Sequence, residues 1–419
     1  MAIRSKRWMV GVGVPLAAVA HARADDNSIS YAHEVYAEDH DRMTVQTDTV
    51  LVHGTLSRWL DLTARGIYDG ISGATPTGAP PVDQLKLQNP RTHTPIPPST
   101  ITGYALPLHG VSGASPPHIT PNDAVPLAHS ADIRRAFDLS AGFTSGINRI
   151  VPEFSYSKEH DYISYGAALN YSIELNEKNT VLNVGWSHDY DRVLNNRFTY
   201  ITSRKIKSTD DIVLGGSQIL TPGTLFTASG TFGFSEGYLN DPYRSVVFQE
   251  TQLDPNGRVI LNGEKRPSNR DSQAILLSLT QAIKPLNASV EGSYRFYHDS
   301  FGINANTFGI AWFQKFGQVV VVSPSFRYYR QSAADFYGIQ FSGDPSFDPA
   351  RVPRFYSSDY RLSALETFTL GLQANVKLHD HWNLQLGYQR YWMRGVDHET
   401  VQSTYPSASI YTIGLNFSF

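Results

Sequence analysis

The stretch from Asp69 to Thr75 is the part of the chain whose residue types best suit a chemical modification. It reads Asp-Gly-Ile-Ser-Gly-Ala-Thr and is followed by Pro-Thr-Gly-Ala-Pro-Pro at 76–81. A threonine hydroxyl is a competent phosphoryl-type acceptor, and small residues beside it would let a transferase approach the backbone. Thr75 is therefore the candidate acceptor. The competing interpretation is a turn-rich exit from a strand, for which Gly and Pro are ordinary.

The same segment resembles the target sequence of periplasmic FMN transferases, Asp-x-x-Ser/Thr-Gly-Ala-Thr/Ser. The matching residues are Asp69, Ser72, Gly73, Ala74 and Thr75. The resemblance implies FMN attached covalently to Thr75 through a phosphoester, with the other four residues as the recognised context. A covalent flavin would supply one- or two-electron chemistry that side chains do not perform. The resemblance further implies a periplasmic FMN transferase and redox proteins as partners, in electron transfer through the cell envelope.

Histidine and aspartate occur side by side at several other places. A cation site would require these side chains to converge in space, and their spacing does not supply that convergence. We therefore expect polar rim residues rather than metal ligands. A hydrolase would likewise need Ser, His and Asp at one rim, so an enzyme is the less favoured alternative. The pairs are His40-Asp41, His160-Asp161, His188-Asp189 and His298-Asp299, and His379-Asp380-His381 lies in an expected inner turn.

The C-terminal segment 410–419 shows the kind of element that must carry these residues. Apolar and polar residues alternate along it, which places them on opposite faces of a β-strand. The apolar face is Tyr411, Ile413, Leu415, Phe417 and Phe419, and the polar face is Thr412, Gly414, Asn416 and Ser418. A final strand that ends in Phe resembles the assembly signal of bacterial outer-membrane barrels. The resemblance implies the barrel-assembly machinery and outer-membrane lipid as partners.

The alternation recurs upstream, at 383–391, 367–378, 288–296 and 165–175. Short links are expected near 56–57, 145–148, 176–179, 221–223, 284–287, 316–317 and 379–382, and long ones at 71–131, 194–209, 239–270, 333–361 and 395–406. A soluble β-sandwich could alternate too, but without this systematic asymmetry of its connections. Short periplasmic turns and long outer loops are typical of outer-membrane barrels. With a first strand near 28–37, the sequence predicts an all-β fold: an antiparallel transmembrane β-barrel of about 16 strands.

The polar strand faces would line an aqueous lumen with charges of both signs. The candidate lumen residues are Glu174, Glu291, Arg295, Arg327 and Lys377, together with Asp48, Asp61, Arg65, Asp138 and Glu153. Solvation of the wall is the favoured interpretation, and a role in selectivity is the alternative. The 71–131 connection, rich in Pro and Gly, is long enough to fold inward as a constriction. Aromatic residues near strand ends, such as Tyr328 and Trp392, are expected to form interfacial girdles.

The N-terminus has the composition of an export signal. A basic start at 4–7 precedes an apolar run at 8–20 and small residues at 22–24. The run is too short for a membrane helix, which needs about 20 residues, so we expect a cleaved signal at 1–24. A single barrel at 25–419 would then reach the cell outer membrane. The absence of cysteine excludes disulfides and thiolate metal sites, and a net charge of −3 gives no footprint for nucleic acid.

Segment 69–81, the block 134–193 and the barrel ending together resemble the bacterial family catalogued as domain of unknown function 3570. The resemblance covers nearly all of 25–419 and is sharpest at 69–81 and 174–183. It implies a barrel and leaves the function open. The alternatives are a flavinylated redox module, a passive channel or transporter, and a structural barrel in a larger complex.

Overall fold

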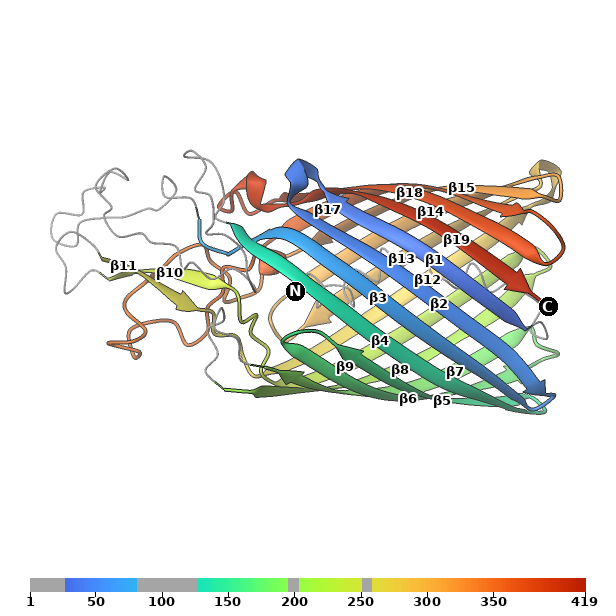
Figure 1. The fold of residues 1–419 in the computed structure, drawn as a ribbon, viewed down its shortest axis with the longest axis horizontal. Coiled ribbons are helices and arrows are strands. Elements are labelled where there is room, and N and C mark those ends of the chain that lie inside the picture. Colours follow the sequence, from blue (N-terminus) through green and yellow to red (C-terminus); the bar gives the residue numbers. More distant parts are fainter. Residues whose placement is uncertain (1–26, 81–126, 195–202, 251–257) are drawn as a thin grey trace.

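Sixteen antiparallel strands close into one barrel, which confirms the predicted fold class (Figure 1). The computed structural model describes residues 27–80, 127–194, 203–250 and 258–419. The ring closes where β1 (Ser28–Glu38) pairs with β19 (Ser407–Ser418), from Ser28 opposite Ser418 to Glu38 opposite Ala408. Every barrel strand therefore has two neighbours, and no strand edge is left open to lipid.

The remaining barrel strands follow one another around the wall. They are β2 (Met43–Ser57), β3 (Leu60–Pro76), β4 (Leu127–Ser145), β5 (Asn148–Lys158), β6 (Tyr162–Leu175), β7 (Thr180–Val193), β8 (Lys205–Thr221), β9 (Thr224–Gly237), β12 (Asn269–Ile283), β13 (Ala288–Asp299), β14 (Asn304–Phe316), β15 (Val320–Gln331), β17 (Leu365–Lys377) and β18 (Trp382–Gly395). The expected first and last strands are both present. At the seam between them the N–H of Phe419 donates to the carbonyl of Asn27 at 2.9 Å.

The strands are apolar toward the outside and polar toward the lumen. In β17, Leu370 and Leu372 are 52% and 53% exposed on the outer face. Thr369 and Gln373 alternate with them and therefore point inward, because successive side chains of a strand lie on opposite faces. An apolar exterior around a polar interior is the pattern of a barrel set in lipid. None of the described helices is both long and apolar enough to span a bilayer.

Tyrosine residues on the outer face donate hydrogen bonds to polar side chains near the rim. The hydroxyl of Tyr328 donates to Glu366 at 2.8 Å, and that of Tyr294 donates to Asn306 at 2.6 Å. A ring with an apolar body and a polar tip suits the boundary between hydrocarbon and water. Tyr328 is one of the residues expected to form an interfacial girdle.

The two ends of the barrel differ in the length of their connections. One end has only short turns, at 58–59, 146–147, 176–179, 222–223, 284–287, 317–319 and 378–381, close to the predicted links. All long connections lie at the other end, at 77–126, 194–204, 238–268, 332–364 and 396–406. We call the ends inner and outer, respectively.

The longest connection is shorter than the predicted 71–131. β3 and β4 remain paired out to Pro76 opposite Leu127. Residues 71–76 and 127–131 are therefore strand, because main-chain pairing across the rim continues beyond the point where the Pro- and Gly-rich composition suggested a loop. The part that was expected to constrict the lumen falls largely in 81–126, outside the described residues, so that expectation stays a prediction.

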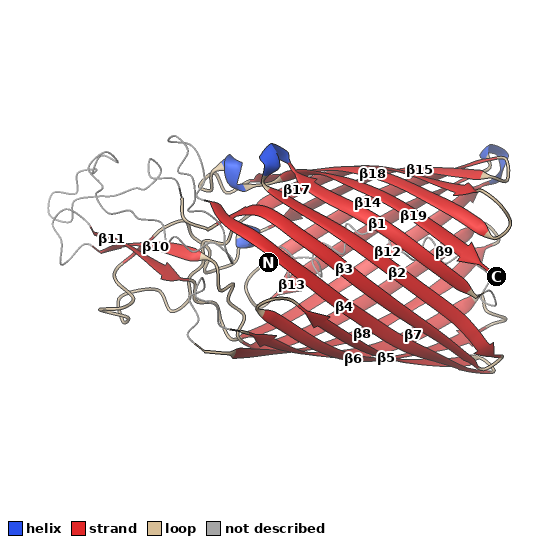
Figure 2. Cartoon of the chain, viewed as in Figure 1, coloured by secondary structure: helices blue, strands red, loops and turns tan. Residues whose placement is uncertain are grey.

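A small sheet lies beyond the outer end, as Figure 2 shows for β10 and β11. It consists of β10 (Ser245–Glu250), β11 (Arg258–Gly263) and β16 (Phe341–Ser342), with β10 in the middle. The first two strands come from the connection between β9 and β12, and the third comes from the connection between β15 and β17. The ring of Phe248 packs on those of Phe341 and Tyr356, with centroids 5.7 and 4.8 Å away. The two connections thus form one unit, 238–250, 258–268 and 332–364, which we call the outer cap.

Candidate functional site: the lumen and its outer mouth

All five charged residues proposed as lumen residues lie on the inner face of the wall. Exposed apolar residues of the same strands mark the outer face, among them Leu169 in β6 and Phe326 in β15, 47% and 39% exposed. Strand alternation then turns the charged residues inward. They are Glu174 in β6, Glu291 and Arg295 in β13, Arg327 in β15 and Lys377 in β17.

Asp48 was also expected in the lumen, and the structure places it on the outer face of β2. It shares that face with Val50, which is 44% exposed. Its carboxylate accepts from the hydroxyl of Tyr31 at 2.6 Å and lies 2.9 Å from Nδ1 of His33. Near the rim the outside of the barrel is polar as well, so polarity alone no longer distinguishes the two faces there.

The lumen-facing arginines of β3, β4 and β5 are neutralised by carboxylates. The pairs are Arg149 with Asp61 at 2.7 Å, Arg65 with Asp138 at 2.6 Å and Arg134 with Asp69 at 2.5 Å. On the other side of the barrel, Arg270 of β12 pairs with Asp299 of β13. These four guanidinium groups are held against the wall and their charge is locally compensated.

Arg295 and Arg327 differ from these four. Neither forms an ion pair with a carboxylate in the part of the chain that the structure describes. The guanidinium of Arg295 lies 5.3 Å from the ring centroid of Tyr297. Arg327 has Arg295, Tyr329 and Tyr391 as its electrostatic neighbours. The lumen therefore contains two positive charges, near each other, that no described carboxylate compensates.

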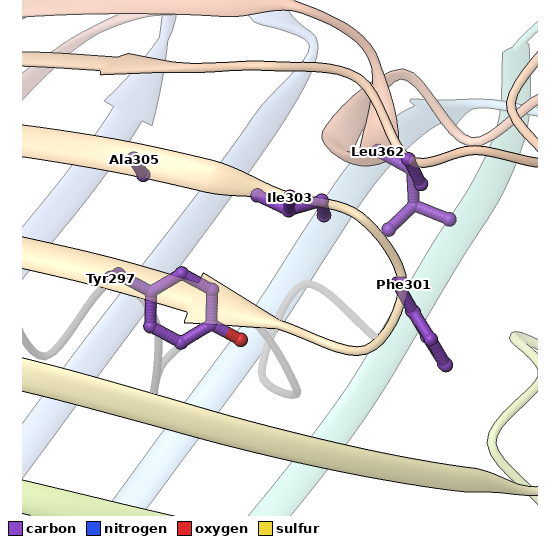
Figure 3. Packing of buried hydrophobic residues seen from close by; sticks show 6 residues of the cluster. Tyr297, Phe301, Ile303, Ala305 and Leu362 are labelled. Atoms are coloured by element: carbon purple, nitrogen blue, oxygen red, sulfur yellow. The ribbon is translucent and has the colours of Figure 1, made fainter.

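The outer cap closes onto the wall just above these arginines. Its short helix η7 (Tyr360–Leu362) buries Leu362, 5% exposed, and Tyr360, 7% exposed. Leu362 joins a cluster at the outer ends of β13 and β14, and Figure 3 shows it beside Tyr297, Phe301, Ile303 and Ala305. Ala334 belongs to the same cluster. Tyr297 faces the lumen, so η7 occupies part of the outer mouth.

An ion network within the cap holds η7 in place. Asp359 precedes η7, is 1% exposed and accepts from the backbone N–H of Arg361 at 3.1 Å. Its carboxylate also binds the guanidinium groups of Arg361 and Arg266, the latter at 2.8 Å, and lies 3.8 Å from Arg244 Nε. Arg361 extends the network to Asp241 at 2.6 Å. Buried charges of this kind are stable only when they remain paired.

The charge state of the network follows from its pairing. Burial alone would raise the pKa of Asp359, but the guanidinium groups of Arg361 and Arg244 outweigh burial and hold that pKa well below its usual range. Burial raises the pKa of Glu264 despite the nearby Arg266. Asp359 is thus the anion around which the arginines of the cap gather.

The cap is also attached to the barrel rim. The N–H of Ser245 donates to the carbonyl of Thr77 at 2.8 Å, and Arg244 donates to the carbonyl of Pro76. The hydroxyl of Tyr337 lies 2.6 Å from that of Thr400, in the connection between β18 and β19. Contacts from the cap therefore reach the ends of at least two barrel hairpins.

The segment that resembles a flavin-transfer target lies in β3 at the outer rim. Asp69 is completely buried, pairs with Arg134 and accepts from Thr47 Oγ1 at 2.6 Å. Thr75 is half-buried and lies opposite Ala128 in the β3–β4 pair. The structure thus keeps Asp69 inside the wall and Thr75 near its upper end.

The glycine of this segment also has a structural role. Gly73 has a φ of +128°, a conformation that residues with a Cβ rarely adopt. A Cβ there would collide with the backbone of Arg42 and Met43, and the next residue, Ala74, donates its N–H to the Arg42 carbonyl. The packing of the barrel therefore explains why Asp and Gly stand at positions 69 and 73. Ser72, in contrast, is exposed.

The His-Asp pairs in the strands do not converge, because neighbouring residues of a strand point to opposite faces. His188 lies outside, 3.0 Å from Asp210, whereas Asp189 turns inward. His298 is outside beside Asn304, and Asp299 is inside with Arg270. In the inner turn, Asp380 instead pairs with Lys377 at 2.7 Å. The expectation that the His-Asp pairs are polar rim residues rather than metal ligands stays a prediction.

One acidic cluster was not anticipated as a unit. Carboxylate oxygens of Asp132, Glu159 and Asp161 lie within 4.8 Å of one another at the outer ends of β4, β5 and β6. Burial, followed by the like charge of Asp132, raises the pKa of both Glu159 and Asp161. In the sequence only His160-Asp161 stands out, because Asp132 is distant along the chain. The pairing of β4 with β5 brings Asp132 close to the other two carboxylates.

The closed ring, apolar exterior and charged lumen define a transmembrane β-barrel of the outer-membrane type. The chain belongs to the family of proteins of unknown function DUF3570, whose model matches residues 12–417. No curated protein matches it significantly.

Several solved barrels are similar to this chain. The monoaromatic hydrocarbon channel CymD is 8% identical over 98% of this chain and 92% of its own, with a TM-score of 0.43. OccK5 (OpdH) of Pseudomonas aeruginosa is 9% identical over 94% of this chain and 98% of its own, with a TM-score of 0.42. The siderophore receptor PirA of Pseudomonas aeruginosa is 12% identical over 94% of this chain, which spans 61% of the receptor, with a TM-score of 0.40.

Proposed function

We propose that the protein is a channel of the cell outer membrane for small polar solutes, closed at its outer mouth by the cap. The observation that carries the proposal is the polar, charged inner face of a barrel large enough to hold an aqueous lumen. A purely structural barrel would have no need to present two arginines to the lumen without carboxylate partners. The cap supplies the device that would keep the envelope sealed when no solute passes.

Planar-bilayer recording of the purified protein tests the proposal. Wild-type protein is expected to conduct rarely, because η7, with Tyr360 and Leu362 packed against the wall, occupies part of the outer mouth. Asp359→Asn removes the anion that the arginines of the cap share, and breaking a buried pair costs about 3–5 kcal/mol. The variant is therefore expected to open more often and to pass more current.

The matched control is Asp348→Asn in the same connection. Asp348 pairs with Arg351 at 3.0 Å, but both side chains are substantially exposed, 40% and 60%. An exposed pair of this kind contributes little to stability, so Asp348→Asn is expected to behave as the wild type. If wild type and Asp359→Asn both fail to conduct while both are folded, the channel proposal is wrong and a structural barrel is the better description.

A second candidate function, which we also propose for testing, is covalent flavinylation of Thr75. The supporting observation is the match of Asp69, Ser72, Gly73, Ala74 and Thr75 to the FMN-transferase target. Since Asp69 is buried in the finished wall, a periplasmic transferase would act before the barrel closes. The flavin would then serve electron transfer with redox proteins of the envelope.

Mass spectrometry of peptide 66–86, from cells with an active FMN transferase, tests the modification. Thr75→Ala is expected to abolish the FMN adduct and Thr75→Ser to retain part of it, since the phosphoester requires the hydroxyl oxygen. Asp69→Ala changes the motif and also breaks the ion pair with Arg134. Arg134→Gln breaks the same ion pair but leaves the motif unchanged, so comparing the two variants separates an effect on folding from an effect on recognition by the transferase. An unmodified peptide in those cells would remove the residue-level support for the redox function.

A further inference from the structure

We infer that Arg295 and Arg327 form a binding site for a small oxyanion, phosphate or carboxylate, beneath the plug formed by η7. The inference deepens the proposed channel function by naming the chemistry of the solute, and it rests on that function. Its starting point is the contrast within the lumen: the described lumen arginines of β3, β4, β5 and β12 are paired with carboxylates, and these two are not.

The register of three strands places Arg295 and Arg327 on either side of β14. Arg295 of β13 lies opposite Thr307 of β14. Arg327 of β15 lies opposite Gly309, the next lumen-facing position of the same strand. The two arginine side chains therefore enter the lumen from the strands that flank β14, and the residues of β14 opposite them are small. Gly309 has no side chain to fill the space between the arginines, and a Cβ there would lie 2.6 Å from Ser293 Oγ.

A hydroxyl-bearing residue next to Arg327 also lacks a partner. Thr369 of β17 faces Arg327 across the β15–β17 pair and is 6% exposed. Its Oγ1 is buried and makes no hydrogen bond within the described residues. Buried polar atoms in native proteins are nearly always satisfied, so an orphan hydroxyl beside an uncompensated guanidinium points to a ligand or ordered water at this place.

The chemistry of the site follows from its donors. Each guanidinium offers a planar fork of N–H groups that matches two oxygens of a carboxylate or phosphate. Both side chains are only half exposed, and a half-buried cation without a counter-charge gains more from an anion than an exposed one would. Tyr297 and Tyr329 lie one lumen-facing position closer to the outer mouth and contribute to the clusters that receive η7. The two arginines therefore lie on the inner side of the clusters that receive η7.

Calorimetric titration of the detergent-folded protein with inorganic phosphate, at low ionic strength, tests the site without requiring conduction. Wild type is expected to bind phosphate, and Arg295→Gln with Arg327→Gln is expected to weaken binding by about tenfold or more, because charge-assisted hydrogen bonds are lost. Arg65→Gln removes one lumen charge that is already paired with Asp138, and it is expected to leave phosphate binding unchanged. Acetate, titrated in the same way, shows whether carboxylates share the site.

Bilayer recording of the same proteins distinguishes this inference from the channel proposal. In a KCl gradient, the double variant is expected to shift the reversal potential toward cation preference, with the barrel still conducting. Phosphate binding that is lost in the double variant supports the site even if no protein conducts. Equal phosphate binding by wild type and double variant, or none by wild type, overturns the inference even if both conduct.

Discussion

At the scale of single residues, burial decides how the charged groups of the outer rim behave. Glu159 and Asp161 are 8% and 7% exposed, and the partly exposed Asp132 lies beside them. Tyr243 of the cap donates a hydrogen bond to Asp161, which couples this rim cluster to the cap. The cluster therefore makes the stability of the outer rim depend on pH.

The sign of this dependence follows from the raised pKa values of Glu159 and Asp161. A group whose pKa is raised by folding contributes stability that is complete below its unfolded pKa and is lost as the pH rises through the folded value. Asp132→Asn removes one cause of the raised pKa values and keeps an oxygen for the N–H groups of Ile133 and His160. The variant is therefore expected to gain Tm over the wild type as the pH rises from 4 to 8.

Thermal unfolding in detergent at several pH values measures this difference. Asp344→Asn is the control, because Asp344 also accepts from backbone N–H groups, those of Ser346 and Phe347, away from the rim cluster. If the Tm of Asp132→Asn minus the Tm of the wild type stays constant over the pH range, or falls with rising pH, repulsion within the rim cluster does not control the stability of the rim.

At the scale of elements, each strand is defined by which of its faces meets lipid. β17 shows this clearly, since Leu370 is 52% exposed on the outer face and Gln373 is turned toward the lumen. A one-residue shift in register would turn the lipid-facing side chains of β17 toward the lumen and the lumen-facing ones toward lipid. Pairing with β15 on one side and β18 on the other prevents this shift.

A charge placed on either face of β17 is expected to have different costs. Leu370→Lys exposes an ammonium group to hydrocarbon and should lower the free energy of unfolding by about 2–4 kcal/mol near the midplane. Gln373→Lys places the same group in the aqueous lumen and should cost far less. Urea unfolding of both variants in lipid vesicles gives the comparison, and equal losses would show that β17 does not present these faces to lipid and water.

At the scale of the whole molecule, the two sides of the lumen carry different charge arrangements. β14 and β4 are eight strands apart in both directions around the ring, so they lie on opposite walls. The β4 wall holds arginine and aspartate in compensated pairs, whereas the strands flanking β14 carry Arg295 and Arg327. The cap then covers this asymmetric lumen from one end. The charges of the lumen and the outer cap are thus contributed by separate parts of one chain.

The alternating pattern of the sequence predicts the barrel, about 16 strands, and the inward direction of Glu174, Glu291, Arg295, Arg327 and Lys377. Those features depend on a period of two and on turn residues, which are local properties of the chain. Asp48 marks the limit of this reasoning, because near the rim the outside of the barrel is polar and the pattern no longer separates the faces.

The way in which distant segments combine depends on the folded chain and is not visible in any local pattern. The ion network around Asp359 joins residues of two connections, from Asp241 to Arg361, and no sequence period links them. The same holds for Asp69, whose place in a motif suggested recognition and whose contacts with Thr47 and Arg134 show a role in the wall. Which lumen arginines are paired with carboxylates depends on the register between strands, because register sets which residues of neighbouring strands lie opposite one another.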